Sequence, residues 1–166
     1  MATVEVSTLI RRPPEEVFAA FVDPAITTRF WFTGSSGALA PGATVRWEWE
    51  MYGVSDTVLV KEFDHPDRLV LGWGSGSTAA GDEHRTTEFR FQQRDEGTVV
   101  TVTETGFAGS ADEALAYVGG ATGGYTTALC AAKALLEHGI ELGAVRDKFP
   151  GCVGVMHPCD RAVQMA

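Results

Sequence analysis

The chain has little cysteine, little positive charge and no long hydrophobic run. Its three cysteines, Cys130, Cys152 and Cys159, are an odd number that does not favour a disulfide framework, so we expect reduced thiols. Thirteen Lys and Arg residues against 22 Asp and Glu give a net charge of −9, which disfavours nucleic acid as a partner because phosphate backbones bind basic side chains. A helix needs about 18 consecutive apolar residues to span a bilayer, and no apolar run approaches that length. The N-terminus also lacks a signal-peptide pattern. We therefore expect a cytoplasmic protein with no membrane span.

Motifs for catalysis or metal binding are also scarce. The four histidines are scattered through predicted turns and helix ends: His65, His84, His138 and His157. None has the spacing of a Ser, His and Asp triad, and the glycine-rich residues 119–124 lack the lysine of a phosphate-binding loop. Cys152, His157 and Cys159 offer three soft ligands, one fewer than a structural zinc site needs. We predict no catalytic residue, no metal and no cofactor.

Alternating apolar and polar residues predict an antiparallel sheet of about six strands. The predicted strands cover residues 3–10, 44–51, 57–63, 69–73, 85–94 and 98–105. A period of two places alternate side chains on the same face of a strand, so Trp47 and Trp49 share one apolar face. On the last strand Val100 and Val102 share a face, and the same parity places Glu104 with them. A carboxylate is therefore expected among apolar neighbours.

Two short helices are predicted directly after the first strand. Pro13 and Pro14 can begin a helix because its first turn has no use for their missing N–H groups. Asp23-Pro24 should end that helix, and Asp23 can cap a second one that runs to about Phe30.

The C-terminal part predicts one short helix and one long helix. Ser110 and Glu113 form a capping-box pattern that begins a helix to about Val118, where Gly119-Gly120 is expected to interrupt it. Apolar residues then repeat at helical spacing from Tyr125 toward Leu142, which predicts an amphipathic helix with one buried face. The whole order of elements is an α+β pattern, in which helices cover one side of an antiparallel sheet.

This order of elements resembles the START-like superfamily, also called SRPBCC or helix-grip, and within it the homologues of the activator of heat-shock protein 90 ATPase. The resemblance is carried by residues 10–18, the Trp31-Phe32 pair, and residues 63–70 and 97–107. It implies a helix-grip fold, with a curved antiparallel sheet wrapped around a long C-terminal helix and two short helices after the first strand. Residues 1–144 would form this domain, and residues 145–166 would be a C-terminal extension of unknown role.

A curved sheet that grips one helix is expected to enclose an apolar cavity, which predicts binding of a small hydrophobic or amphipathic ligand. Such pockets combine apolar walls with a few polar groups. Glu104 is the predicted polar anchor; alternatively it lies in water or pairs with an arginine. The predicted ligand-binding residues are Trp31, Trp47, Trp49, Leu71, Trp73, Phe89, Phe91, Val100, Val102, Glu104, Tyr125 and Leu129.

Two other functions stay open at this point. A cyclase or hydratase acting in the same cavity would need two polar groups that converge there, and Glu104 could be joined by Asp56, His84 or Tyr125. The family resemblance also implies a chaperone-associated interaction module, for which the sequence shows no separate docking domain. A homodimer is a further possibility that the sequence does not decide.

Overall fold

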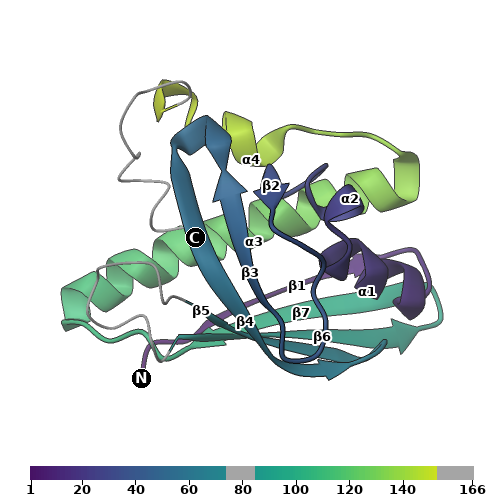
Figure 1. Cartoon of the computed structure of the whole chain (residues 1–166), viewed down its shortest axis with the longest axis horizontal. Helices are drawn as coiled ribbons and strands as arrows, with labels where there is room; N and C mark the ends of the chain where they lie inside the picture. The colour runs from purple at the N-terminus through teal and green to yellow at the C-terminus, as the bar shows by residue number, and fades with distance from the viewer. Residues whose placement is uncertain (74–84, 153–166) are drawn as a thin grey trace.

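A computed structural model describes residues 1–73 and 85–152 of the chain (Figure 1). The elements in chain order are β1 (Val4–Ile10), α1 (Pro14–Val22), α2 (Pro24–Thr27), β2 (Gly34–Ser35), β3 (Thr44–Trp49), the 3₁₀ turn η1 (Glu50–Tyr52), β4 (Val54–Asp64), β5 (Arg68–Trp73), β6 (Thr86–Arg94), β7 (Gly97–Thr105), α3 (Ala111–His138), α4 (Ala144–Asp147) and the 3₁₀ turn η3 (Pro150–Cys152). This order confirms the predicted α+β, helix-grip-like fold.

The described strands form one antiparallel sheet of seven strands in the order β1-β7-β6-β5-β4-β3-β2. Figure 1 shows the sheet curving so that the β3–β4 hairpin points upward and crosses in front of α3 in this view, while β1, β7 and β6 lie below the helix. The seventh strand is the two-residue β2, which was not among the six predicted strands. The predicted strand to residue 51 is too long, because β3 ends at Trp49 and Met51 lies in η1.

The two short helices follow β1 as predicted, but the second ends at Thr27 and not near Phe30. Pro13 occupies the N-cap of α1, with Glu15 and Glu16 in the first turn near the positive end of the helix. Asp23 ends α1 and caps α2, because its side chain accepts a hydrogen bond from the Ala25 N–H at 2.9 Å.

The predicted break in the C-terminal helix is wrong. One helix, α3, runs through Gly119-Gly120 without interruption, from the capping box of Ser110 and Glu113 to His138. A glycine costs a helix only about 1 kcal/mol relative to alanine, so burial of one continuous face against the sheet outweighs it. The helix also ends four residues before the predicted end, where Gly139 adopts a left-handed conformation with φ of 67°.

The segment after α3 packs onto the domain as far as the structure describes it. Val145 of α4 is buried, and the hydroxyl of the buried Tyr52 in η1 donates to the carbonyl oxygens of Val145 and Arg146. Cys152 packs against the core and is disulfide-bonded, so the expectation of reduced thiols is wrong for this residue. Cys130 is a free cysteine on the exposed side of α3.

Candidate functional site

The inner face of the sheet carries the residues that strand parity predicted. All twelve predicted ligand-binding residues are buried, and none is more than 5% exposed. They come from β3, β5, β6 and β7, from the segment after α2, and from the face of α3 that covers the sheet. Strand parity is thus confirmed for the burial of the members on β3, β5, β6 and β7, whereas the role of all twelve as the lining of a cavity stays a prediction.

Around β3 these side chains pack ring against ring. The Trp47 ring stacks on Phe32 with centroids 4.4 Å apart, and it meets Trp31 at 5.2 Å and Trp73 at 5.7 Å. Ring pairs of this kind are typical of a hydrophobic core. The polar end of the inner face, beyond Trp73, is therefore the more informative region for function.

Glu104 lies at that polar end, near the C-terminal end of β7, and is 3% exposed. Its Oε2 accepts a hydrogen bond from Thr87 Oγ1 at 2.7 Å and another from the Tyr125 hydroxyl, while its Oε1 accepts one from the Tyr117 hydroxyl. Thr87 stands opposite Glu104 on β6, and the two tyrosines reach down from α3. Helix and sheet thus hold one buried carboxylate between three hydroxyl groups.

Both tyrosines are kept in their protonated form. Burial raises the pKa of the Tyr125 phenol well above its ordinary value, and the nearby Glu104 charge raises it further. The pKa of Tyr117 is raised by the same two causes. Each phenol is therefore an O–H donor throughout the physiological pH range, as the carboxylate of Glu104 requires.

A buried ion pair adjoins this group. Arg85, directly before β6, approaches Asp56 of β4 with Nη2 3.3 Å from Oδ2, and both side chains are no more than 5% exposed. The Arg85 Nη1 also donates to the Tyr117 hydroxyl at 2.9 Å. Its guanidinium carbon lies 5.0 Å from the centroid of the Trp73 ring and 5.6 Å from that of Tyr117.

We call this network the polar cluster. Its members come from β4, β5, β6, β7 and α3 and their borders: Asp56, Trp73, Arg85, Thr87, Glu104, Tyr117 and Tyr125. Trp73 belongs to it because its indole N–H donates to Thr87 Oγ1 at 2.6 Å.

Sequence reasoning had singled out Glu104, Trp73 and Tyr125 as binding residues, and it had named Asp56 as a possible partner. It missed Arg85 and the two remaining hydroxyl residues. Thr87 shares the parity of Phe89 and so had a detectable signal.

Tyr117 lies eight residues before Tyr125, which places both on one face of a continuous helix. The predicted break at Gly119-Gly120 put them on separate helices, so this relation was missed. Arg85 shares the parity of Thr87 and Phe89 in the predicted strand 85–94, so its inward direction was detectable, but its partners were not. The candidate His84 lies outside the described residues.

The described part of the chain shows no group of three or more His, Cys, Asp or Glu side chains that would suit a metal ion. Of the three soft ligands noted in the sequence, His157 and Cys159 lie outside that part. No helix within residues 1–73 and 85–152 has the length and apolar character needed to cross a bilayer.

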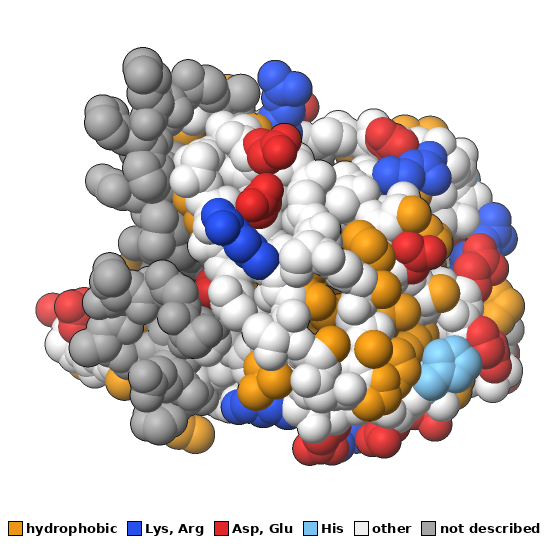
Figure 2. All heavy atoms as spheres, in the orientation of Figure 1, with side chains coloured by type: hydrophobic (Ala, Val, Ile, Leu, Met, Phe, Trp, Pro, Cys, Tyr) orange, Lys and Arg blue, Asp and Glu red, His pale blue; other side chains and the backbone are white. Residues whose placement is uncertain are grey.

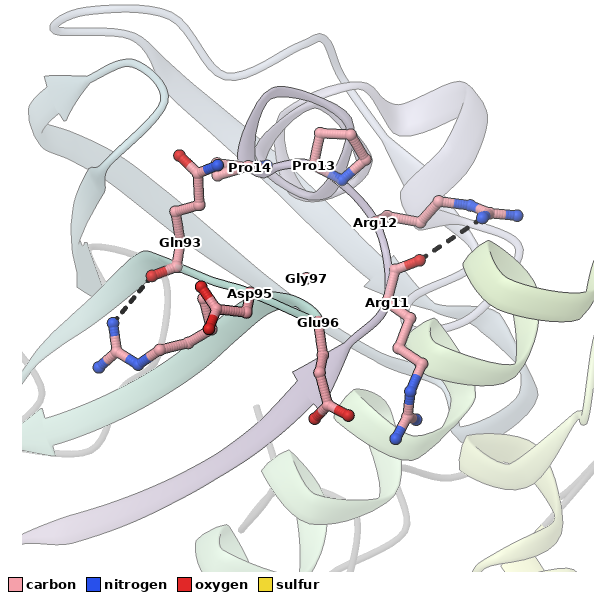
Figure 3. A pocket seen from close by; sticks show the side chains of 9 residues that line it. Arg11, Arg12, Pro13, Pro14, Gln93, Asp95, Glu96 and Gly97 are labelled. Carbon is pink, nitrogen blue, oxygen red and sulfur yellow. Dashed lines mark hydrogen bonds between the residues drawn. The ribbon is translucent and has the colours of Figure 1, made fainter.

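Two pockets lined by described residues lie on the outer surface, away from the polar cluster. One, of about 280 Å³, is formed between the start of α1 and the β6–β7 turn (Figure 3). Its guanidinium groups are already engaged, since Arg12 donates to the Leu136 carbonyl oxygen at 2.8 Å and Arg11 pairs with Glu137. The other, of about 410 Å³, lies beside Arg68 and Arg90.

Figure 2 shows acidic and basic side chains interspersed on the face seen in Figure 1. Neither outer pocket combines apolar walls with a few buried polar groups. The polar cluster is therefore the stronger candidate.

Comparison with known proteins gives a consistent result. The family model described as Activator of Hsp90 ATPase homolog 1-like protein matches residues 11–137. No curated protein sequence matches the chain.

Solved structures are similar over most of the chain. Protein SSP2350 from Staphylococcus saprophyticus is 26% identical, with a TM-score of 0.69 over 84% of this chain and 95% of that one. The Aha1 dimer from Colwellia psychrerythraea is 16% identical, with a TM-score of 0.74 over 84% and 98%. CalU16 from Micromonospora echinospora is 16% identical, with a TM-score of 0.61 over 92% and 89%. The last two likenesses concern the fold alone.

Proposed function

The chain belongs to the family of Activator of Hsp90 ATPase homolog 1-like proteins, and we propose that it binds a small hydrophobic or amphipathic molecule between the sheet and α3. The eleven apolar and aromatic residues among the twelve predicted from the sequence would supply the walls. The polar cluster would hold the polar end of the ligand, with Glu104 as its anchor.

The concentration of buried polar groups at one place supports this proposal. Six polar or charged residues are buried in the described part of the chain, and four of them belong to the polar cluster: Asp56, Arg85, Thr87 and Glu104. The other two, Thr27 and Thr98, have an ordinary structural role because each hydroxyl donates to a backbone carbonyl oxygen. Burying an ionic group costs free energy, and apolar side chains at the same positions would avoid that cost. The presence of buried ionic groups here therefore favours a role in recognition.

The proposal is tested by native mass spectrometry of gently purified protein, followed by titration of each ligand found. We expect Glu104→Gln to weaken binding about tenfold, the effect of losing one hydrogen bond to a charged group. Glu5→Gln is the matched control, because it is the same substitution at an exposed glutamate of β1. Equal affinity of the wild type and Glu104→Gln for every ligand found would contradict the role of Glu104.

An enzyme acting in the same space is the second candidate, and one observation favours it. A cyclase or hydratase needs two proton-transferring groups that converge, and the polar cluster links Glu104 to Asp56 through Tyr117 and Arg85. Loss of turnover in both Glu104→Gln and Asp56→Asn, with ligand affinity retained, would favour this candidate over simple binding.

The family suggests two kinds of partner. The relative from Colwellia psychrerythraea was solved as a dimer, and a homodimer of this chain stays a prediction that light scattering on the purified protein would test. A chaperone partner, suggested by the family description, is tested by a pull-down with the chaperone. The cytoplasmic location also stays a prediction.

A further inference from the structure

Arg85 lies in a setting that suits an organic cation. Its guanidinium group lies near the aromatic rings of Trp73 and Tyr117, and a carboxylate oxygen of Asp56 lies 3.3 Å from Nη2. Aromatic rings attract cations, and the attraction is strongest where water is excluded. The Arg85 side chain is 4% exposed, so this is a desolvated cation site that a group of the chain itself fills.

Among the residues that the structure describes, the charges of the polar cluster are unequal. In formal charges the polar cluster contains two carboxylates, Asp56 and Glu104, and one cation, Arg85. The remaining members are neutral hydroxyl or indole groups, and burial keeps the two tyrosines neutral. Among the described residues a cationic ligand group would therefore be favoured here, whereas an anionic one would meet two carboxylates.

We propose that the ligand of this site is an amphipathic organic cation, whose ammonium or guanidinium group replaces the Arg85 guanidinium beside Trp73, Tyr117 and Asp56. This inference rests on the proposed binding function and adds the chemical class of the ligand. Arg85 would then be a built-in competitor, which leaves the cation site when the ligand arrives. The apolar body of the ligand would lie toward the aromatic residues of β3 and β5.

An anionic ligand is the alternative, in which Arg85 would be the receptor and not the competitor. The two readings predict opposite effects of removing Arg85. Without the Arg85 guanidinium an anion would lose the cationic partner that the described residues offer it, but a cation would gain the vacated place. The sign of the change in affinity therefore decides between them.

The first test uses wild-type protein and three probes with one apolar body: 1-naphthylmethylamine, 1-naphthylmethanol and 1-naphthoate, titrated calorimetrically at neutral pH. We expect the amine to bind about tenfold tighter than the alcohol, and the carboxylate to bind weakest. Equal or tighter binding of the alcohol or the carboxylate would overturn the cation class while leaving the proposed function intact. Absence of binding by all three would overturn both.

The second test uses Arg85→Ala. We expect its affinity for the amine to rise about tenfold over the wild type, because the competing guanidinium is gone. An unchanged or lower affinity for the amine would overturn the proposal. The matched control is Arg46→Ala, which removes an exposed guanidinium from the outer face of β3.

A third measurement allows for the loss of stability expected when the ion pair between Arg85 and Asp56 is removed. Methylguanidinium at millimolar concentration should raise the Tm of Arg85→Ala but not that of the wild type, and the neutral methylurea should raise neither. Equal effects of the two compounds on the variant would show that the vacated place does not select a cation. If Arg85→Ala does not fold, the wild-type titrations decide the question alone.

Discussion

Replacing Glu104 by glutamine tests the polar cluster most directly, because the side chain keeps its shape and loses its charge. The carboxylate accepts three hydrogen bonds, from Thr87 and Tyr125 at Oε2 and from Tyr117 at Oε1. A glutamine amide offers one accepting oxygen and one donating NH₂ group, so at least one hydroxyl loses its acceptor.

The loss of stability in Glu104→Gln follows from these hydrogen bonds. A hydrogen bond to a charged group contributes about 1.5–3 kcal/mol, and one to a neutral group roughly half of that. Loss of the Tyr117 bond and weakening of the other two exceeds the gain from no longer burying a charge. We therefore expect Glu104→Gln to lower the free energy of unfolding by about 2–4 kcal/mol.

Denaturant unfolding followed by tryptophan fluorescence measures this change, with Glu5→Gln as the control that should stay within about 0.5 kcal/mol of the wild type. A tyrosine titration adds an independent readout. Without the Glu104 charge the pKa of Tyr125 should fall, yet stay above its ordinary value because burial is the larger cause of the shift. A loss of stability below about 0.5 kcal/mol, with unchanged tyrosine titration, would refute the network as described.

Three further predictions concern other parts of the chain. Burial acts to raise the pKa of Glu88, but hydrogen bonds from Arg68 and Arg90 outweigh it, so the pKa is lowered. The stability that Glu88 contributes is therefore present at neutral pH and lost as the pH falls through the pKa of the folded state. Glu88→Gln should cost about 1 kcal/mol at neutral pH and little in acid, as measured by denaturant unfolding at several pH values. Tyr52→Phe should cost about 1–3 kcal/mol and speed hydrogen exchange at the Phe149 amide, which donates to the Tyr52 hydroxyl at 3.3 Å; unchanged exchange would contradict this anchor. Gly97→Ala should cost about 2 kcal/mol or more in thermal unfolding, since φ is +149° and a Cβ would lie 2.3 Å from the Ile10 carbonyl oxygen; an unchanged Tm would show that this close approach relaxes easily.

The strands and their faces were determined by the sequence itself. A period of two is local, so Trp47 and Trp49 could be assigned to one face without knowing which strands pair. The same parity placed Glu104 inside, and its burial confirms this. The two helices after β1 could also be predicted, because proline and an Asp cap act within a few residues.

Only the tertiary structure decided the continuity of α3 and the membership of the polar cluster. Gly119-Gly120 disfavours a helix locally, but burial of a long face against the sheet supplies more free energy than the glycines cost. That continuity brings Tyr117 onto the same stripe as Tyr125 and over Glu104.

Parity places Arg85 on the inner face with Thr87 and Phe89, but it does not reveal its partners. They include Asp56, 29 residues earlier, and Tyr117 on a helix that begins long after Arg85. Local patterns fix which side chains face inward. Which of them meet depends on pairings between distant strands and on the path of the helix across them.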